Sequence, residues 1–238
     1  MPPLEPSDSI VEEIQQAVLQ ERERSAQERS RLLNTVTQIA SLLLRSHDYV
    51  TVLPDVVRLL GEAVGSDRCL IIQELPEAET GRPWLEVLAE WARDGISEVS
   101  AAIPDGEPQL VVEGEWAALH EQLRRGELTN YIVAEMPEPW RGFLAAQEVV
   151  SSASVPILVQ GQFWGHIDFD NCHEARLYDA AEIGILQTAA EIIAGAIERQ
   201  AKDEELLHLE QARTRSAAKL AQQLERLNSE LQQRDRLL

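Results

Sequence analysis

Hydrophobic and polar positions alternate along residues 151–160 and again along residues 162–170, with Gly161 between the two runs. Alternation with a period of two predicts strands, and a glycine between short runs predicts a hairpin. Alternate side chains of a strand point to opposite faces of its sheet. One face carries Val155, Ile157, Val159, Phe163, Ile167 and Phe169. The other face carries Ser152, Ser154, Pro156, Trp164, His166, Asp168 and Asp170.

Other segments follow the same two periodicities. Strand patterns cover 68–74, 84–91 and 130–134, and helical patterns cover 8–46, 49–64, 115–125, 136–146 and 179–238. Residues 94–114 are rich in glycine, proline and acids, which favours a loop. The connections are mostly too short for parallel crossovers, so the pattern predicts an antiparallel sheet.

The two terminal helices carry heptad-like apolar stripes. The C-terminal stripe comprises Ile185, Ala189, Ile192, Ala196, Leu206, Leu220, Leu224, Leu227 and Leu231. This spacing predicts a parallel coiled coil between two copies of the chain, least tightly packed between Arg199 and Arg213. The N-terminal stripe comprises Leu32, Val36, Ile39 and Leu43. It fits a helix lying on its own domain or, as we prefer, a seam shared with a second chain.

Charge is concentrated in the middle of the chain. Residues 48–196 hold 26 of the 41 acidic residues but only 8 of the 21 Lys and Arg residues. We therefore expect three parts: an N-terminal signalling and dimerisation helix over 1–46, a domain over 47–196, and a C-terminal coiled-coil helix over 197–238. An acidic surface repels phosphate backbones and anionic lipid, so we expect neither nucleic-acid nor membrane binding.

The N-terminus and the two cysteines bear on the compartment. The first six residues lack the basic and apolar regions of a signal peptide, and no apolar run approaches the roughly 20 residues that span a bilayer. Cys69 and Cys172 fall in different elements, so a disulfide framework is not indicated. We expect a cytoplasmic protein with reduced thiols.

Several motifs resemble the GAF domain of bacterial, especially cyanobacterial, signal-transduction proteins. These are Val155-Pro156-Ile157, Gly161-Gln162-Phe163-Trp164-Gly165, Asp170-Asn171-Cys172 before a long helix, and Tyr131 to Glu135 followed by Pro137 and Trp140-Arg141. The resemblance covers roughly residues 35–200. It implies an α+β fold: an antiparallel sheet of five to six strands, helices on both faces, and long coiled-coil-like terminal helices.

The resemblance also implies a ligand pocket on the face of the sheet opposite the terminal helices. In similar bilin-binding domains, chromophore contacts lie at positions matching Ser152, Ser154 and Asp170. We expect His166 and Asp168 on the same face, Trp140 as a wall, and Arg141 as counter-ion to the acids. The group at His166, Asp168 and Asp170 fits an internal polar network, contacts to a small polar or cationic ligand, or a metal site. We predict no metal.

The resemblance does not bring an attachment cysteine. In chromophore-binding relatives that cysteine precedes the Pro-Ile strand, whereas residues 143–150 contain none and the Asp105-Gly106-Glu107 loop contains none. We therefore predict no cofactor and regard a covalent bilin as unlikely.

We expect a non-enzymatic sensory and dimerisation module. It would bind an unknown small molecule and pass the pocket state through a parallel helical coiled coil to an output domain. That output, a histidine kinase of a two-component system or a cyclase, would lie beyond Leu238 or on a separate chain. Three alternatives remain: a ligand-free dimerisation scaffold, redox sensing through Cys172, and an enzyme like the free methionine sulfoxide reductases.

Overall fold

The computed structural model describes residues 8–235 apart from 77–82, 103–109 and 112–115. The strands are β1 (Arg68–Pro76), β2 (Pro83–Ala92), β3 (Leu110–Val111), β4 (Thr129–Ile132), β5 (Ser151–Val159) and β6 (Gln162–Asn171). The α-helices are α1 (Asp8–Arg45), α2 (Leu53–Val64), α3 (Trp116–Arg124), α4 (Trp140–Ala146) and α5 (Ala180–Asp235). Short 3-10 helices cover Tyr49–Val52, Ser100–Ala102 and Val133–Glu135.

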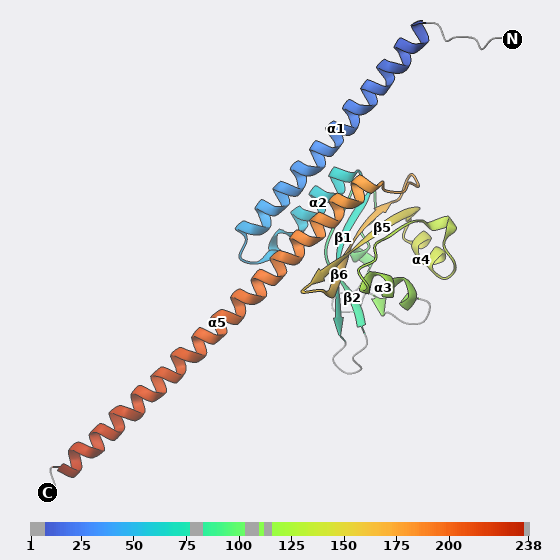
Figure 1. The fold of residues 1–238 in the computed structure, drawn as a ribbon. Helices are drawn as coiled ribbons and strands as arrows, with labels where there is room; N and C mark the ends of the chain where they lie inside the picture. Colours follow the sequence, from blue (N-terminus) through green and yellow to red (C-terminus); the bar gives the residue numbers. More distant parts are fainter. Residues whose placement is uncertain (1–7, 77–82, 103–109, 112–115, 236–238) are drawn as a thin grey trace. The chain divides into compact units, whose positions relative to one another are not determined.

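The chain divides into two units, Met1–Ala196 and Ile197–Leu238. In the first unit all strand pairs are antiparallel, and they form one six-stranded sheet in the order β3-β2-β1-β6-β5-β4. The helices α1 and α2 and the first part of α5 lie on one face, and α3 and α4 lie on the other (Figure 1). The α+β fold is confirmed, with one addition: β3 falls inside the segment predicted as a loop.

The face under the terminal helices is a closed apolar core. Phe169 pairs with Cys69 and Ala153 on the neighbouring strands, and Ile167 pairs with Ile71 and Val155. All six side chains are at most 1% exposed. The predicted apolar face of the hairpin is therefore confirmed at Ile167 and Phe169, and it stabilises the sheet by removing these side chains from water.

The β5–β6 turn and the crossing with β1 both depend on glycine. Gln160 and Gly161 have φ values of 52° and 75°, the left-handed pair that matches the twist of a two-residue hairpin. Gly165 lies against β1, where an added Cβ would sit 2.1 Å from the carbonyl oxygen of Ile72. Any larger residue at Gly165 would push the two central strands apart.

The alternation breaks near the turn, and the predicted faces of Phe163 and Trp164 are wrong. Leu158 pairs with Phe163 but Ile157 pairs with Gly165, so Trp164 is an extra residue in β6. Such a bulge exchanges the faces of the residues beyond it. The Phe163 ring accordingly lies 6.3 Å from that of His166. Trp164 instead contacts Tyr49, with ring centroids 6.3 Å apart.

The N-terminal stripe packs on its own domain. Leu32, Val36, Ile39 and Leu43 are at most 9% exposed within the single chain, and α1 contacts α2. The Arg31 guanidinium also donates to the Glu62 carbonyl at 3.0 Å. Our preference for a shared seam at these four positions is therefore wrong, because the domain already covers them.

The helix α5 changes character along its length. Ala189 and Ala196 are 0% and 2% exposed, so they pack inside the first unit and offer no surface to a partner, contrary to our prediction for these two positions. Ile185 and Ile192 are half-buried. In the second unit Leu206, Leu220 and Leu224 are 58–60% exposed. The side chains of Leu227 and Leu231 lie outside the described part.

One described helix, over Ala180–Arg226, contains an 18-residue window apolar enough to cross a membrane by length and composition, with mean hydropathy 1.4. This differs from our expectation that no such run exists. Within the protein 39% of that window is buried. A helix that packs its apolar side against a sheet produces the same composition, so the window is weak evidence for a membrane span.

Candidate functional site

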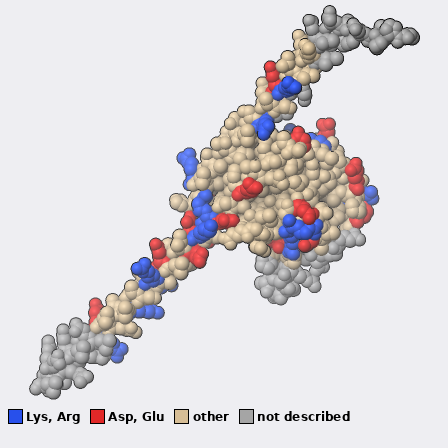
Figure 2. Space-filling view, viewed as in Figure 1, with Lys and Arg blue, Asp and Glu red and all other residues tan. Residues whose placement is uncertain are grey.

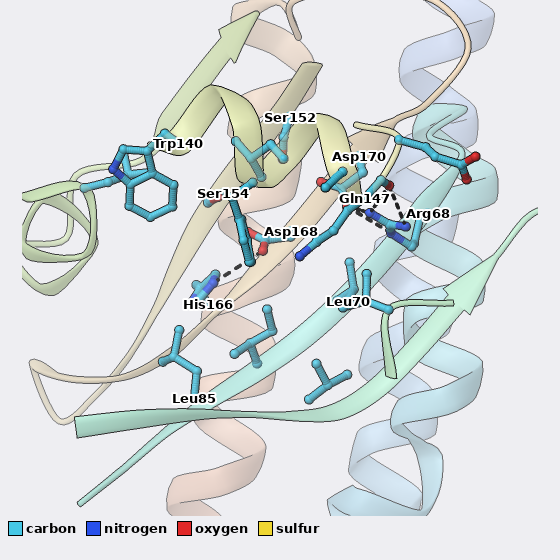
Figure 3. A pocket seen from close by; sticks show the side chains of 18 of the residues that line it. Arg68, Leu70, Leu85, Trp140, Gln147, Ser152, Ser154, His166, Asp168 and Asp170 are labelled. Atoms are coloured by element: carbon cyan, nitrogen blue, oxygen red, sulfur yellow. Dashed lines mark hydrogen bonds and ion pairs between the residues drawn. The ribbon is translucent and has the colours of Figure 1, made fainter. Parts of the chain in front are cut away.

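A cavity of about 580 Å³ lies on the sheet face opposite the terminal helices (Figure 3). Its floor is formed by β1, β2, β5 and β6, and its walls by α3, α4 and residues 97–99. Small-molecule sites typically have this size. Six of the predicted site residues line it: Ser152, Ser154, His166, Asp168, Asp170 and Trp140. Their role in binding a ligand stays a prediction.

Strand register explains why these polar side chains meet. Asp170 pairs with Ser152 on β5 and with Arg68 on β1. Asp168 lies two residues along, on the same face, and pairs with Ser154. Each cross-strand row therefore presents a serine and an aspartate side by side.

Arg68 forms the buried centre of the site. Its Nη2 lies 2.8 Å from Oδ2 of Asp170, and its Nε lies 3.0 Å from the same oxygen. It also donates to the carbonyls of Ser97 at 3.0 Å and Gln147 at 3.4 Å. Its side chain is 1% exposed. The arginine thus joins the strands to the end of α4 and to the loop after β2.

Sequence reasoning assigned the counter-ion role to Arg141, and this is wrong. Arg141 is half-exposed and pairs with Glu138, three residues earlier, at 2.8 Å. It does not line the cavity. Arg68 was missed because it stands at the first position of a strand, where a charged residue usually marks a boundary. The useful signal was its register with Asp170, which requires knowing that β1 and β6 are neighbours.

The two aspartates of β6 differ in acidity. Burial raises the pKa of Asp170 to about 6, an effect opposed by Arg68 and reinforced by the charge of Asp168. Burial also acts on Asp168, but His166 and a hydrogen bond from Ser154 outweigh it and hold the pKa of Asp168 below its usual value. Burial and the two carboxylates raise the pKa of Tyr131, so its phenol stays protonated.

His166 and Asp168 form a pair with two unpartnered atoms. Nε2 of His166 lies 3.4 Å from Oδ2 of Asp168. Nδ1 of His166 and Oδ1 of Asp168 are buried and have no hydrogen-bond partner among the described residues. Buried polar atoms without partners are rare in native proteins, so this pair is where a ligand atom or a water would be expected.

A second histidine stands at the edge of the cavity. His120 is 5% exposed, contacts the Glu74 carboxylate through Nε2, and lies edge-on to Phe163. Arg124 contacts the same carboxylate at 2.7 Å. Burial raises the pKa of Glu74, but the bonds from His120 and Arg124 outweigh it and lower the pKa overall. Sequence reasoning missed this group because its members come from distant segments.

Neither cysteine is set up as a nucleophile. Cys69 is buried in the apolar core, and burial raises its pKa well above the ordinary value. Cys172 is half-buried, and burial raises its pKa to about 11. A thiol of this kind carries little thiolate near neutral pH. These values disfavour redox sensing through Cys172 and reduction of methionine sulfoxide.

Acidic and basic side chains are mixed on the visible surface (Figure 2), and the absence of nucleic-acid binding stays a prediction. Figure 2 shows Asp and Glu side chains interspersed with Lys and Arg side chains, without a broad basic surface among the described residues in view. Phosphate binding depends on such a surface.

Comparison with known proteins identifies relatives in signal transduction. The chain is 35% identical over 172 residues to the methanogenesis regulatory histidine kinase FilI of Methanothrix harundinacea, covering 72% of this chain and 19% of that one. It is 24% identical over 207 residues to the circadian input-output histidine kinase CikA of Synechococcus elongatus, covering 81% and 26%. The chain therefore spans about a fifth to a quarter of these relatives.

A solved phycocyanobilin-bound GAF domain from a cyanobacterial phytochrome has the same fold. Its TM-score is 0.57 at 17% identity, over 72% of this chain and 96% of that one. Solved domains with bound phycoerythrobilin and biliverdin also match. Our prediction that no cofactor is bound and that a covalent bilin is unlikely is contradicted by these matches, because this fold holds bilins in other proteins.

The GAF family model matches residues 48–197, which is more than half of the chain. It covers the whole sheet, the cavity and the start of α5. The fold, the motifs and this match agree, and the chain belongs to the GAF domain family.

Proposed function

We propose that the chain is the non-catalytic sensory and dimerisation module of a cytoplasmic histidine-kinase-type signalling protein. Residues 47–196 receive the signal, and the helices over 1–46 and 197–238 carry it. The observation that supports this most directly is a polar link, described below, between the cavity and the start of α5.

The link begins with Arg68, the first residue of β1, and with Asp67, which directly precedes the strand. Arg68 enters the cavity and binds Asp170, while Asp67 points toward the segment after β6. Oδ2 of Asp67 accepts hydrogen bonds from the backbone N–H groups of Cys172 and His173 at 2.8 and 3.1 Å. A movement of Arg68 caused by a ligand would therefore act on the chain just after β6.

That segment leads directly into α5. Tyr178 packs its ring against Phe169, and its side chain is contacted by the guanidinium of Arg176 at 4.2 Å from the ring centroid. Asp179 then caps the helix by accepting from the N–H groups of Ala181 and Glu182, each at 2.8 Å. Since the cap fixes where the helix starts, a shift before it changes how α5 leaves the domain.

The ligand is a small molecule in the 580 Å³ cavity, and the bilins held by solved domains of this fold are candidates. Biliverdin added to the purified chain would show binding as a change in its visible absorption, and unfolding in acidic urea would separate attached from free pigment. The exposed leucines of the second unit support a parallel homodimer. Leu220→Asp with Leu224→Asp should turn the dimer into monomers in sedimentation velocity.

Hydrogen–deuterium exchange of the full chain tests the link. Arg68→Met leaves Asp170 without its partner, so we expect faster exchange across residues 172–196. The matched control is Arg125→Met, which removes an exposed arginine whose ion pair, at 2.8 Å, is with the exposed Glu127. Unchanged exchange over 172–196 in a folded Arg68→Met protein would contradict the proposed route, and a dimer that binds nothing would favour a passive scaffold.

A further inference from the structure

The arginine of the cavity has no free donor. A guanidinium carries five N–H groups. Those of Arg68 bond to Oδ2 of Asp170 at 2.8 and 3.0 Å, to the carbonyl of Ser97 at 3.0 Å, and to the carbonyl of Gln147 at 3.4 and 3.5 Å. Its side chain is also 1% exposed. An anionic ligand therefore finds no unused N–H group on Arg68.

The other polar side chains on the cavity face of the sheet are largely engaged with one another. Ser152 hydrogen-bonds to Asp170, and Ser154 hydrogen-bonds to Asp168. The phenol of Tyr131 bonds to both serines. The two atoms without partners in the histidine–aspartate pair described above are themselves buried. A ligand therefore meets these strands as a network that is already formed.

Gln147 differs from these residues. It is half-buried, and its side chain points from the end of α4 into the cavity (Figure 3). Arg68 binds its backbone carbonyl, but its side-chain amide has no hydrogen-bond partner among the residues that the structure describes. A primary amide carries an N–H donor and a C=O acceptor side by side. Gln147 can therefore bind a ligand without breaking an existing bond.

The backbone around Gln147 is fixed although it lies at the end of a helix. The N–H groups of Gln147 and Val149 both donate to the carbonyl of Leu144, at 3.1 and 3.0 Å. Glu148 between them has a φ of 64°, a left-handed conformation that favours glycine. Strained residues of this kind are concentrated at ligand-binding and catalytic sites. The side-chain amide of Gln147 is thus presented to the cavity from a fixed point of the backbone.

Much of the remaining lining is apolar. Leu70 and Leu85 come from the strands of the floor, and Leu119 and Phe143 come from the helices of the wall. A ligand body that fills this space is itself apolar, as in most small-molecule sites.

We propose that Gln147 is the ligand-recognition residue of the cavity, and that its amide forms two hydrogen bonds with an uncharged, apolar ring compound carrying neighbouring N–H and C=O groups, as in a lactam. This inference rests on the proposed ligand-binding role of the cavity and adds a recognition residue and a ligand class. The lactam edge complements a primary amide, because its N–H faces Oε1 and its C=O faces Nε2. Since the carbonyl of the same residue binds Arg68, a ligand on the amide acts at the start of the proposed route to α5.

A matched pair of probes tests the ligand class. The lactam 3,4-dihydroquinolin-2-one has an aromatic ring fused to the amide, and its N-methyl derivative keeps the rings and the carbonyl but has no N–H. Ligand-observed NMR titrations of the full chain give both dissociation constants. We expect the lactam to bind about fivefold or more tightly than the derivative, the size of one net hydrogen bond. Equal binding, tighter binding of the derivative, or no binding of either probe would overturn the inference.

The variant Gln147→Met assigns the preference to this residue. It keeps an unbranched side chain but removes both polar atoms of the amide, so the difference between the two probes should disappear. A residue that only shapes the cavity would weaken both probes alike and preserve the difference. The matched control is Gln122→Met at an exposed position of α3, which should leave both affinities unchanged. Circular dichroism checks that both variants fold, and a fivefold preference that survives in folded Gln147→Met would contradict the proposal.

The biliverdin titration separates this inference from the broader function. If biliverdin binds but Gln147→Met keeps the lactam preference, recognition by Gln147 is wrong while the cavity still receives a ligand. If biliverdin and both probes fail to bind and Arg68→Met leaves the exchange of α5 unchanged, the proposed function fails as well. A lactam preference that is lost in Gln147→Met supports both.

Discussion

The two faces of the central sheet are built from the same strands, but one is packed under helices and the other borders a cavity. On the helix face, Phe169 and Ile167 are fully buried in an apolar layer. On the cavity face, the alternating residues Asp168 and Asp170 sit beside about 580 Å³ of space. One strand therefore supplies stability from one set of side chains and, in the proposed function, ligand recognition from the other. The effects of substitutions on the two faces can be measured separately.

The largest expected effect is on the helix face. Phe169→Ala removes a 0% exposed ring that contacts Tyr178, and it should lower the free energy of unfolding by about 3–5 kcal/mol in urea denaturation. A loss below about 1 kcal/mol would mean that this face is not the stabilising one.

An intermediate effect should come from the cavity face through pH. The raised pKa of Asp170, about 6 against an ordinary 3.8, favours its protonated form in the folded state. The contribution of Asp170 to the free energy of unfolding is therefore fully present below about pH 4. It is lost as the pH rises through about 6, and the loss is on the order of 2–3 kcal/mol. Asp168, whose pKa is lowered, contributes in the opposite sense and loses its contribution as pH falls below its ordinary range.

Carboxyl carbon NMR titration of the labelled protein checks this. Asp170 should titrate near pH 6 and Asp168 below its ordinary value. Asn replacements assign the two signals. Two aspartates that both titrate at the ordinary value would show that the cavity face is open to water and that the two faces differ less than described.

The smallest effect should come from Ser154→Ala, also on the cavity face. Ser154 is buried, and its hydroxyl hydrogen-bonds to Asp168. A hydroxyl is small, so its removal changes the packing little. We expect a loss of less than about 1 kcal/mol of unfolding free energy, with a larger change in ligand affinity. A loss as large as that of Phe169→Ala would remove the distinction between the faces.

The sequence was sufficient to assign most strand residues to the correct face of the sheet. In a strand with a period of two, the face of one residue determines the face of every other. It failed at Phe163 and Trp164, since nothing in the local pattern marks a single-residue bulge. It failed also for the α1 stripe at Leu32 to Leu43, because an apolar heptad looks the same whether it packs on its own domain or on a partner. Arg68 required the order of the strands, which is a long-range property.

The claim that the cavity state reaches α5 can be tested most directly by the distance between two copies of the helix. Spin labels at Arg213→Cys, in a Cys172→Ser background, report this distance by double electron–electron resonance. Leu70→Trp fills the cavity from its floor, and Leu158→Trp adds the same ring at an exposed position of β5. The account predicts that Leu70→Trp changes the distance distribution while Leu158→Trp preserves it. Identical distributions, or no distance between copies at all, would contradict it.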